Sequence, residues 1–139
     1  ILIMENIWQI TVGQNSQREC LKNMEIILVM KDNDELLDLK NKVESVYGKE
    51  KICIFQTAED AAEYAKDRHI DVCYTEVVLK RMSGIALAKE LKKKEENIQI
   101  NFISDTKEYA LDAWKLFIND YLLKPVSLNA VQHSRDCSR

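Results

Sequence analysis

Short apolar runs alternate with amphipathic segments from residue 24 to the C-terminal end of the sequence. The runs are rich in branched residues, which is typical of parallel strands that are covered on both faces. We predict strands at 26–30 (IILVM), 51–55 (KICIF), 71–75 (DVCYT), 98–103 (IQINFI) and 121–123 (YLL). The fourth run is the least regular, because Gln99 and Asn101 interrupt its apolar positions.

Apolar residues recur at helical spacing in the segments between these runs. The periodic positions are Leu36, Leu39, Val43 and Val46, then Ala58, Ala61, Ala62 and Ala65, and then Leu87, Ala88 and Leu91. Residues that can cap helices precede each set, namely Asn33 and Asp34, Thr57, and Ser83 with Gly84. The alternation of strands and helices predicts a doubly wound α/β sandwich built from right-handed crossovers.

Two further helices are predicted near the C-terminal end, and their apolar content differs. The segment 104–117 has a large apolar face formed by Ala110, Ala113, Trp114 and Phe117. We expect Trp114 and Phe117 to lie in the core. The last helix, 128–139, has only Leu128 and Val131 as sizeable apolar anchors, so we expect it to be short or frayed.

The length of 139 residues fits one domain with one core. Residues 1–23 stand outside the alternation, although "IWQITVG" within them has the composition of a strand. The periodic part begins at Met24, whereas the chain itself starts without a methionine. We therefore expect an N-terminal extension, 1–23, followed by the domain proper, 24–139.

Composition narrows the classes of partner. A net charge of −3 gives no electrostatic reason to expect direct nucleic-acid binding. No apolar stretch approaches the roughly 20 residues that a membrane span needs, and the N-terminal segment lacks the basic start of a secretory signal. The cysteines, Cys20, Cys53, Cys73 and Cys137, show no C-x-x-C spacing. We expect a cytoplasmic protein with reduced thiols, of which Cys53 and Cys73 lie in the core.

Polar side chains follow the predicted strands at the point where each strand ends. They are Lys31 and Asp32, Glu76, Ser104 and Asp105, and Lys124. The carboxyl ends of the strands in a doubly wound sheet meet at one crevice, which is where such folds bind their ligands. The sequence therefore predicts a polar crevice of mixed charge around the carboxylate of Glu76.

Two stretches of the sequence resemble the receiver domain of bacterial response regulators. They are "DVCYTEVVLKRMSGIALAKEL" and "NFISDTKEYALDAWKLFINDYLLKPVS", and the second is most similar to receivers of LytTR-class transcription regulators. The resemblance covers about residues 24–132. It implies a CheY-like, flavodoxin-like sheet of five parallel strands in the order 2-1-3-4-5.

The resemblance places Glu76 at the position where receivers carry the phosphorylated aspartate. The family holds its catalytic magnesium with two acidic residues after the first strand, and Met30 and Lys31 stand at those positions here. Asp32 is the nearest carboxylate, one residue later. Magnesium needs hard oxygen ligands, and a glutamate carboxylate lies one methylene farther out than that of an aspartate. The resemblance therefore implies a degenerate phosphorylation site without a metal.

Four further positions match the family pattern. Ser104 corresponds to the switch hydroxyl, Tyr121 to the signalling aromatic and Lys124 to the invariant lysine. Pro125 corresponds to a proline whose preceding peptide bond is commonly cis. The receiver resemblance also implies homodimers, which we expect to form through residues 109–117 and Tyr121.

The interface candidates are Tyr109, Trp114, Lys115 and Phe117, with Tyr109 and Lys115 the better candidates for an exposed partner surface. A histidine kinase or an output domain is the other expected partner. The preferred interpretation is a non-enzymatic pseudo-receiver without a cofactor, which signals by protein contact as part of a transcriptional regulator. Glu76 either imitates a phosphorylated aspartate or has drifted and pairs with Lys31 or Lys124.

Two alternatives remain. The first is a receiver phosphorylated unconventionally, with Asp32 holding a metal. The second is a flavodoxin-like domain that binds a nucleotide or a flavin. It has less support, because only three glycines occur and none forms a phosphate-binding loop after a strand.

Overall fold

The computed structural model describes residues 24–48 and 50–137. Its centre is a five-stranded sheet in the order β2-β1-β3-β4-β5, and every neighbouring pair of strands is parallel. The strands are β1 (Glu25–Val29), β2 (Lys51–Phe55), β3 (Val72–Glu76), β4 (Gln99–Ser104) and β5 (Asp120–Leu123). The predicted fold class and strand order are confirmed. The expected extension, 1–23, lies outside the described residues.

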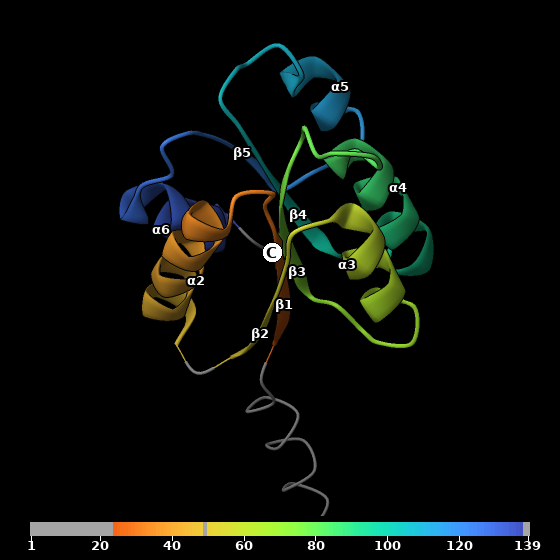
Figure 1. Cartoon of the computed structure of the whole chain (residues 1–139), viewed down its shortest axis with the longest axis horizontal. Helices are drawn as coiled ribbons and strands as arrows, with labels where there is room; N and C mark the ends of the chain where they lie inside the picture. Colours follow the sequence, from red (N-terminus) through yellow and green to blue (C-terminus); the bar gives the residue numbers. More distant parts are fainter. Residues whose placement is uncertain (1–23, 49, 138–139) are drawn as a thin grey trace, which may run out of the picture.

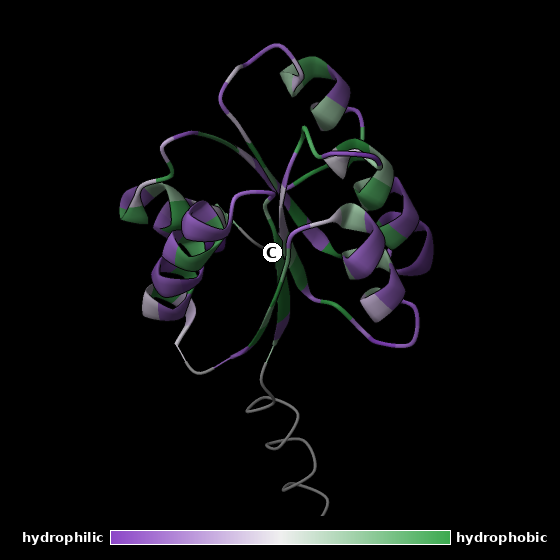
Figure 2. Cartoon of the chain, in the orientation of Figure 1, coloured by the Kyte–Doolittle hydropathy of each residue, from purple (hydrophilic) through white to green (hydrophobic). Residues whose placement is uncertain are grey.

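Helices cover both faces of this sheet (Figure 1). They are α2 (Asn33–Tyr47), α3 (Ala58–Ala65), α4 (Gly84–Lys94), α5 (Ala110–Trp114) and α6 (Leu128–Cys137). Helices α2 and α6 lie on one face, and α3 and α4 lie on the other (Figure 1). Apolar residues line the strands and the inner helix faces, whereas the outer helix faces are largely hydrophilic (Figure 2). None of the helices in the described part of the chain is long and apolar enough to cross a membrane.

The sheet separates two hydrophobic cores because successive side chains of a strand point to opposite faces. From β1, Ile27 and Val29 belong to the core on the α3 and α4 side. Ile26 and Leu28 belong to the core under α2 and α6. All four side chains are fully buried, as the continuous apolar run predicted.

Helix α2 begins one residue earlier than its expected caps. The carboxylate of Asp32, not of Asn33 or Asp34, accepts a hydrogen bond from the backbone N–H of Glu35 (2.9 Å). Its backbone is extended, as an N-cap residue requires. The other predicted caps, Thr57 and Ser83, are confirmed.

Gly84 allows the loop after β3 to fold back onto the strand end. A Cβ atom at this position would lie 1.8 Å from the carbonyl oxygen of Glu76. The backbone N–H of Gly84 donates to the carbonyl oxygen of Val77 (2.9 Å). Glycine is therefore required by close backbone approach at this point, and it starts α4 directly beside the crevice.

Helix α5 differs from its prediction. It is only five residues long, and Ala113 is its buried residue. The side chains of Trp114 and Phe117 are 48% and 85% exposed, so the expectation that they lie in the core is wrong. The chain leaves the helix at Phe117, whose φ of 57° is unusual for a residue with a side chain. Ile118 fills the core in its place.

Helix α6 is neither short nor frayed, so that expectation is also wrong. It runs over ten residues and packs against α2. Val131 and Ser134 are buried, while Leu128 is partly exposed. The Ser134 hydroxyl hydrogen-bonds the hydroxyl of Tyr74, and Arg135 donates to the carbonyl oxygen of Val46 (2.8 Å). Polar contacts therefore anchor α6 in addition to its apolar residues. The apolar periodicity of the sequence identified only the apolar anchors.

The irregular fourth strand is a full member of the sheet. Asn101 is completely buried, and its side-chain oxygen accepts a hydrogen bond from the amide of Asn119 (2.8 Å). The Asn119 amide also donates to the carbonyl oxygen of Ser134 (2.8 Å). The polar interruption of β4 thus ties this strand to the start of β5 and to α6.

Candidate functional site

The carboxylate of Glu76 lies at the centre of the crevice, at the last position of β3. This residue is only 2% exposed. Its Oε1 atom accepts a hydrogen bond from the backbone N–H of Lys31 (2.7 Å). Its Oε2 atom accepts from the ammonium groups of Lys31 and Lys124. Both oxygens are therefore engaged by groups of the chain itself.

Lys31 reaches Glu76 from the neighbouring strand. It follows the end of β1, which pairs with β3 along its length. Its Nζ atom lies 3.2 Å from Oε2 of Glu76 and 3.1 Å from the carbonyl oxygen of Val78. One flexible lysine thus binds both the carboxylate and the loop that follows it.

Lys124 closes the crevice from the other side. Its Nζ atom pairs with Glu76 and with Oε1 of Glu35 (2.9 Å), which comes from the first turn of α2. Burial opposes the charged form of Lys124, but hydrogen bonds to Glu76 and Glu35 outweigh it and raise the pKa of this lysine. The peptide bond between Lys124 and Pro125 is cis, as the family pattern implied.

The charges of this cluster balance one another. Two carboxylates, Glu76 and Glu35, face two ammonium groups, Lys31 and Lys124. The sequence analysis expected Glu76 to pair with Lys31 or with Lys124, and the structure contains both ion pairs. Burying a carboxylate is costly unless it is paired and hydrogen-bonded, and Glu76 satisfies both conditions.

The residues at the crevice do not fit a magnesium ion. Met30 is buried in the core under α2 and α6, so it contributes no oxygen. Lys31 places an ammonium group where a cation would need a ligand, and Asp32 caps α2. In the described ranges, 24–48 and 50–137, no group of three or more His, Cys, Asp or Glu residues could hold a metal ion.

Ser104 and Tyr121 both hydrogen-bond Thr106, a residue that the sequence analysis did not identify. The Ser104 hydroxyl, which is buried, accepts a hydrogen bond from the backbone N–H of Thr106 (3.1 Å). The Tyr121 hydroxyl donates to the carbonyl oxygen of the same residue (2.7 Å). The loop after β4 is therefore held by both side chains, and Ser104 faces this loop.

Glu35 and Glu59 were also missed. Glu35 binds Lys124, and the carboxylate of Glu59 accepts from the backbone N–H of Met82 (3.1 Å), which fixes the loop before α4. Both glutamates lie in the first turn of a helix, where acidic residues are common for local reasons. Because this local role explains an acidic residue at both positions, the sequence did not reveal that Glu35 and Glu59 also bind residues far along the chain.

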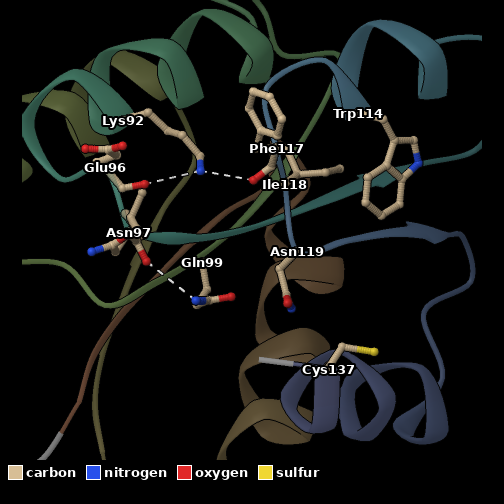
Figure 3. A pocket seen from close by; sticks show the side chains of 10 residues that line it. Lys92, Glu96, Asn97, Gln99, Trp114, Phe117, Ile118, Asn119 and Cys137 are labelled. Carbon is tan, nitrogen blue, oxygen red and sulfur yellow. Dashed lines mark hydrogen bonds between the residues drawn. The ribbon is translucent and has the colours of Figure 1, made fainter. Parts of the chain in front are cut away.

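The interface candidates lie around α5. Tyr109 is half-buried against the core, whereas Trp114, Lys115 and Phe117 are exposed. Leu111 is 74% exposed beside them. Trp114 and Phe117 also line a groove of about 1020 Å³ near the amino ends of β4 and β5 (Figure 3). The backbone carbonyl of Phe117 accepts a hydrogen bond from Lys92 (3.0 Å), which holds the strained turn in place.

Comparison with known proteins agrees with this fold. The family described as "Response regulator receiver domain" matches residues 27–134. The transcriptional regulatory protein NatR of Bacillus subtilis is 28% identical over 85 residues, which are 60% of this chain and 36% of NatR. The chain therefore spans about a third of the length of this curated relative.

Solved receiver domains share the architecture. The response regulatory domain of mrkE from Klebsiella pneumoniae superposes with a TM-score of 0.76 at 21% identity, over 83% of this chain and 94% of that chain. The receiver domain of an HD domain-containing protein from Pseudomonas fluorescens Pf-5 gives a TM-score of 0.74 at 18% identity, over 84% and 94%.

The chain belongs to the response regulator receiver family. It is a receiver domain of two-component signalling, and receiver domains are generally non-enzymatic modules that interact with histidine kinases and output domains.

Proposed function

We propose that this receiver signals by protein contact and without conventional aspartyl phosphorylation. The observation that carries the proposal is the pairing of the buried Glu76, whose Oε1 atom accepts from the backbone N–H of Lys31 and whose Oε2 atom accepts from the ammonium groups of Lys31 and Lys124. A carboxylate attacks a phosphodonor through a free oxygen lone pair. Here two ammonium groups lie against Oε2 and neutralise the charge, and a backbone N–H is bound to Oε1.

The surroundings of Glu76 support the same conclusion. Phosphoryl transfer depends on a cation that neutralises the developing charge on the transferred group. The side chains at the end of β1 are an apolar core residue, an ammonium and a helix cap, namely Met30, Lys31 and Asp32. An ammonium group supplies a positive charge but no vacant coordination position, so it cannot hold a phosphodonor as magnesium does.

The unconventional alternative has less support. A metal held by Asp32 would compete with the cap of α2, because the Asp32 carboxylate already accepts from the N–H of Glu35. A nucleotide- or flavin-binding role lacks a glycine-rich loop after any strand of the printed sequence. Glu76 therefore acts in our proposal as a permanent anion that joins β1, β3 and the β5–α6 connection.

The partner surface of the proposed function is the α5 face, formed by Tyr109, Leu111, Trp114, Lys115, Phe117 and Tyr121. Exposed apolar side chains gather there, which is typical of protein contact sites. We propose that two copies of the chain associate through this face in the cytoplasm. We also propose, from the likeness to NatR, that the receiver serves a transcriptional regulator without contacting nucleic acid itself.

A magnesium titration tests the proposal. The melting temperature should be the same in millimolar magnesium chloride and in sodium chloride of equal ionic strength, because the crevice holds no cation site. The double variant Lys31→Asp, Glu76→Asp should gain a magnesium-dependent rise. Met30 stays unchanged in this variant, because an aspartate there would bury a charge in the core. A magnesium-specific rise in the unmodified chain would overturn the proposal.

A further inference from the structure

A cysteine, a histidine and an aspartate meet where α6 ends beside the start of β5. Asp120 is the first residue of β5, and its Oδ2 atom lies 3.1 Å from Nδ1 of His133. Cys137 is four positions after His133 on α6, which places both on the same helix face. Its Sγ atom lies 3.5 Å from Nε2 of His133. This cluster is remote from Glu76 along the strands.

Asp120 is the fixed member of the cluster. Its side chain is mostly buried, and its Oδ1 atom accepts a hydrogen bond from the backbone N–H of Tyr121 (2.8 Å). The second oxygen is thus aimed at Nδ1 of His133. Asp120 therefore orients the imidazole and leaves its Nε2 atom on the side of Cys137.

The sulfur of Cys137 lies beside the whole imidazole ring. Its distances to the two ring nitrogens are nearly equal, at 3.5 Å to Nε2 and 3.7 Å to Nδ1. A sulfur in line with a single N–H would lie much farther from the second nitrogen. The sulfur therefore lies beside the ring, and the nearer nitrogen, Nε2, is the one that does not face Asp120.

Other charged groups surround the pair of Cys137 and His133. Asp136, the adjacent carboxylate on α6, is paired with the guanidinium of Arg135 (2.9 Å). From α4, Lys92 adds a positive charge on the opposite wall of the groove, with Glu96 beside it. His133 is thus the basic side chain in direct contact with the Cys137 sulfur.

Cys137 also opens onto a cavity. It lines the same groove of about 1020 Å³ as Trp114, Phe117 and Asn119, and it lies on the wall opposite the two aromatic side chains (Figure 3). The wall carries amide, carboxylate and ammonium groups as well as aromatic rings. A small molecule with both charged and apolar parts can therefore reach the sulfur.

We propose that Cys137 is a thiol–disulfide exchange site for low-molecular-weight, zwitterionic disulfides such as cystine or glutathione disulfide. The proton of the Cys137 thiol passes to His133, and the thiolate attacks one sulfur of the disulfide. That S–S bond breaks as the new bond to Cys137 forms, and the departing thiolate takes the proton from His133. One disulfide is reduced to one thiol while Cys137 is oxidised to a mixed disulfide.

The other described thiols have different surroundings. Cys73 is fully buried, and burial raises the pKa of its thiol well above the ordinary range. Cys53 is half-buried in β2 and donates to the hydroxyl of Tyr64 (3.1 Å). Neither has an imidazole partner, so the exchange should be selective for Cys137 among them.

Incubation of the chain with excess glutathione disulfide, followed by intact-mass and peptide analysis, tests the proposal. We expect a glutathionyl adduct on Cys137, and none on Cys53 or Cys73, which disappears on reduction and is absent in Cys137→Ser. In His133→Gln, the rate of adduct formation near pH 7 should fall by about ten-fold, and it should rise steeply toward pH 9 as it does for an unassisted thiol. Asp120→Asn, which keeps an oxygen for the Tyr121 N–H, should slow the reaction less.

His69→Gln is the matched control. Like His133, His69 contacts a carboxylate, but its ring nitrogens pair with Asp71 and Glu95 and not with a cysteine. It should leave the rate unchanged. Far-ultraviolet circular dichroism of each variant checks that the fold is retained. An adduct on Cys53 or Cys73 in place of Cys137, or a rate and pH profile unaffected by His133→Gln in a folded variant, would overturn the proposal.

Discussion

The crevice around Glu76 and the groove beside α5 lie toward opposite ends of the strands. The side chains of the two regions are oriented in opposite ways. At the carboxyl ends, Glu76, Lys31 and Lys124 are turned toward one another, and the central carboxylate is nearly inaccessible. Toward the amino ends of β4 and β5, Trp114 and Phe117 are turned toward solvent. The side chains of the crevice thus hold the strand ends together, while the groove and α5 expose surface for contact.

This difference separates a region whose charged groups are paired with one another from a region whose apolar side chains are open to contact. A receiver fold needs its crevice to be open to a phosphodonor, yet the described residues here neutralise one another's charge. Its α5 region keeps large apolar side chains outside the core, at a cost in solvation that a lone structural domain does not require. Substitutions at the two regions should therefore affect different measurements.

The largest expected effect is that of Gly84→Ala at the crevice. The added Cβ would lie 1.8 Å from the carbonyl oxygen of Glu76, so the loop or the strand end must shift. We expect a loss of more than about 3 kcal/mol in the free energy of unfolding, measured by urea denaturation. Gly48→Ala is the control, because it has a φ of 85° but no atom within 4 Å of the added Cβ. Its cost should be about 1–3 kcal/mol from the backbone conformation alone, and equal costs would contradict the contact.

Removing Lys124 should have the next largest effect. Lys124→Met leaves the buried Glu76 with Lys31 as its remaining ammonium partner and releases Glu35, so we expect a loss of about 2 kcal/mol in the free energy of unfolding. Lys31→Met should cost only about 0–1 kcal/mol, because its ammonium is more exposed and its backbone N–H still binds Glu76. A reversed order in urea denaturation would show that Lys31 dominates the cluster.

At the α5 face, we expect a change in association instead of stability. Leu111→Ser should alter the free energy of unfolding by less than about 0.5 kcal/mol, because this side chain is 74% exposed. Sedimentation should show weaker self-association in this variant than in the parent chain. Leu37→Ser, on the exposed surface of α2, is the matched control and should leave association unchanged. A monomeric parent chain at high micromolar concentration would contradict the proposed dimer.

The smallest expected effect is a pH dependence at His69, which lies away from both regions. Hydrogen bonding to Glu95, opposed by burial and assisted by Asp71, raises the pKa of His69. A raised pKa means that this contribution to stability is complete below the unfolded value of about 6.5 and is lost as pH rises through the folded value. The pH profile of the melting temperature should therefore flatten in His69→Gln just above that value. An unchanged profile would assign the dependence to another group.

Much of the fold could be predicted, because its determinants are local. A branched apolar run such as residues 26–30 indicates a buried strand. The alanine stripe of α3 indicates a helix that packs closely against the sheet. Caps and turns were less certain, since Asp32, Asn33 and Asp34 are chemically similar neighbours and backbone geometry selects among them. The α6 prediction was wrong because Ser134 and Arg135 stabilise that helix through distant partners.

Only those residues of the candidate site could be predicted that lie at strand ends or match the family pattern. They identified Glu76, Lys31 and Lys124, because neighbouring strands end together. They could not identify Glu35 or Thr106, whose roles depend on where α2 and the loop after β4 lie. They also placed Trp114 in the core, because helical spacing does not reveal that the helix ends there.

Intact-mass analysis after incubation with acetyl phosphate and magnesium tests the central claim most directly. The account predicts that the chain gains no phosphoryl group, while a conventional receiver treated in parallel does, because Lys31 and Lys124 bind both oxygens of Glu76. A phosphoryl group mapped to Glu76 or to Asp32 would contradict the account and would make this a phosphorylated receiver.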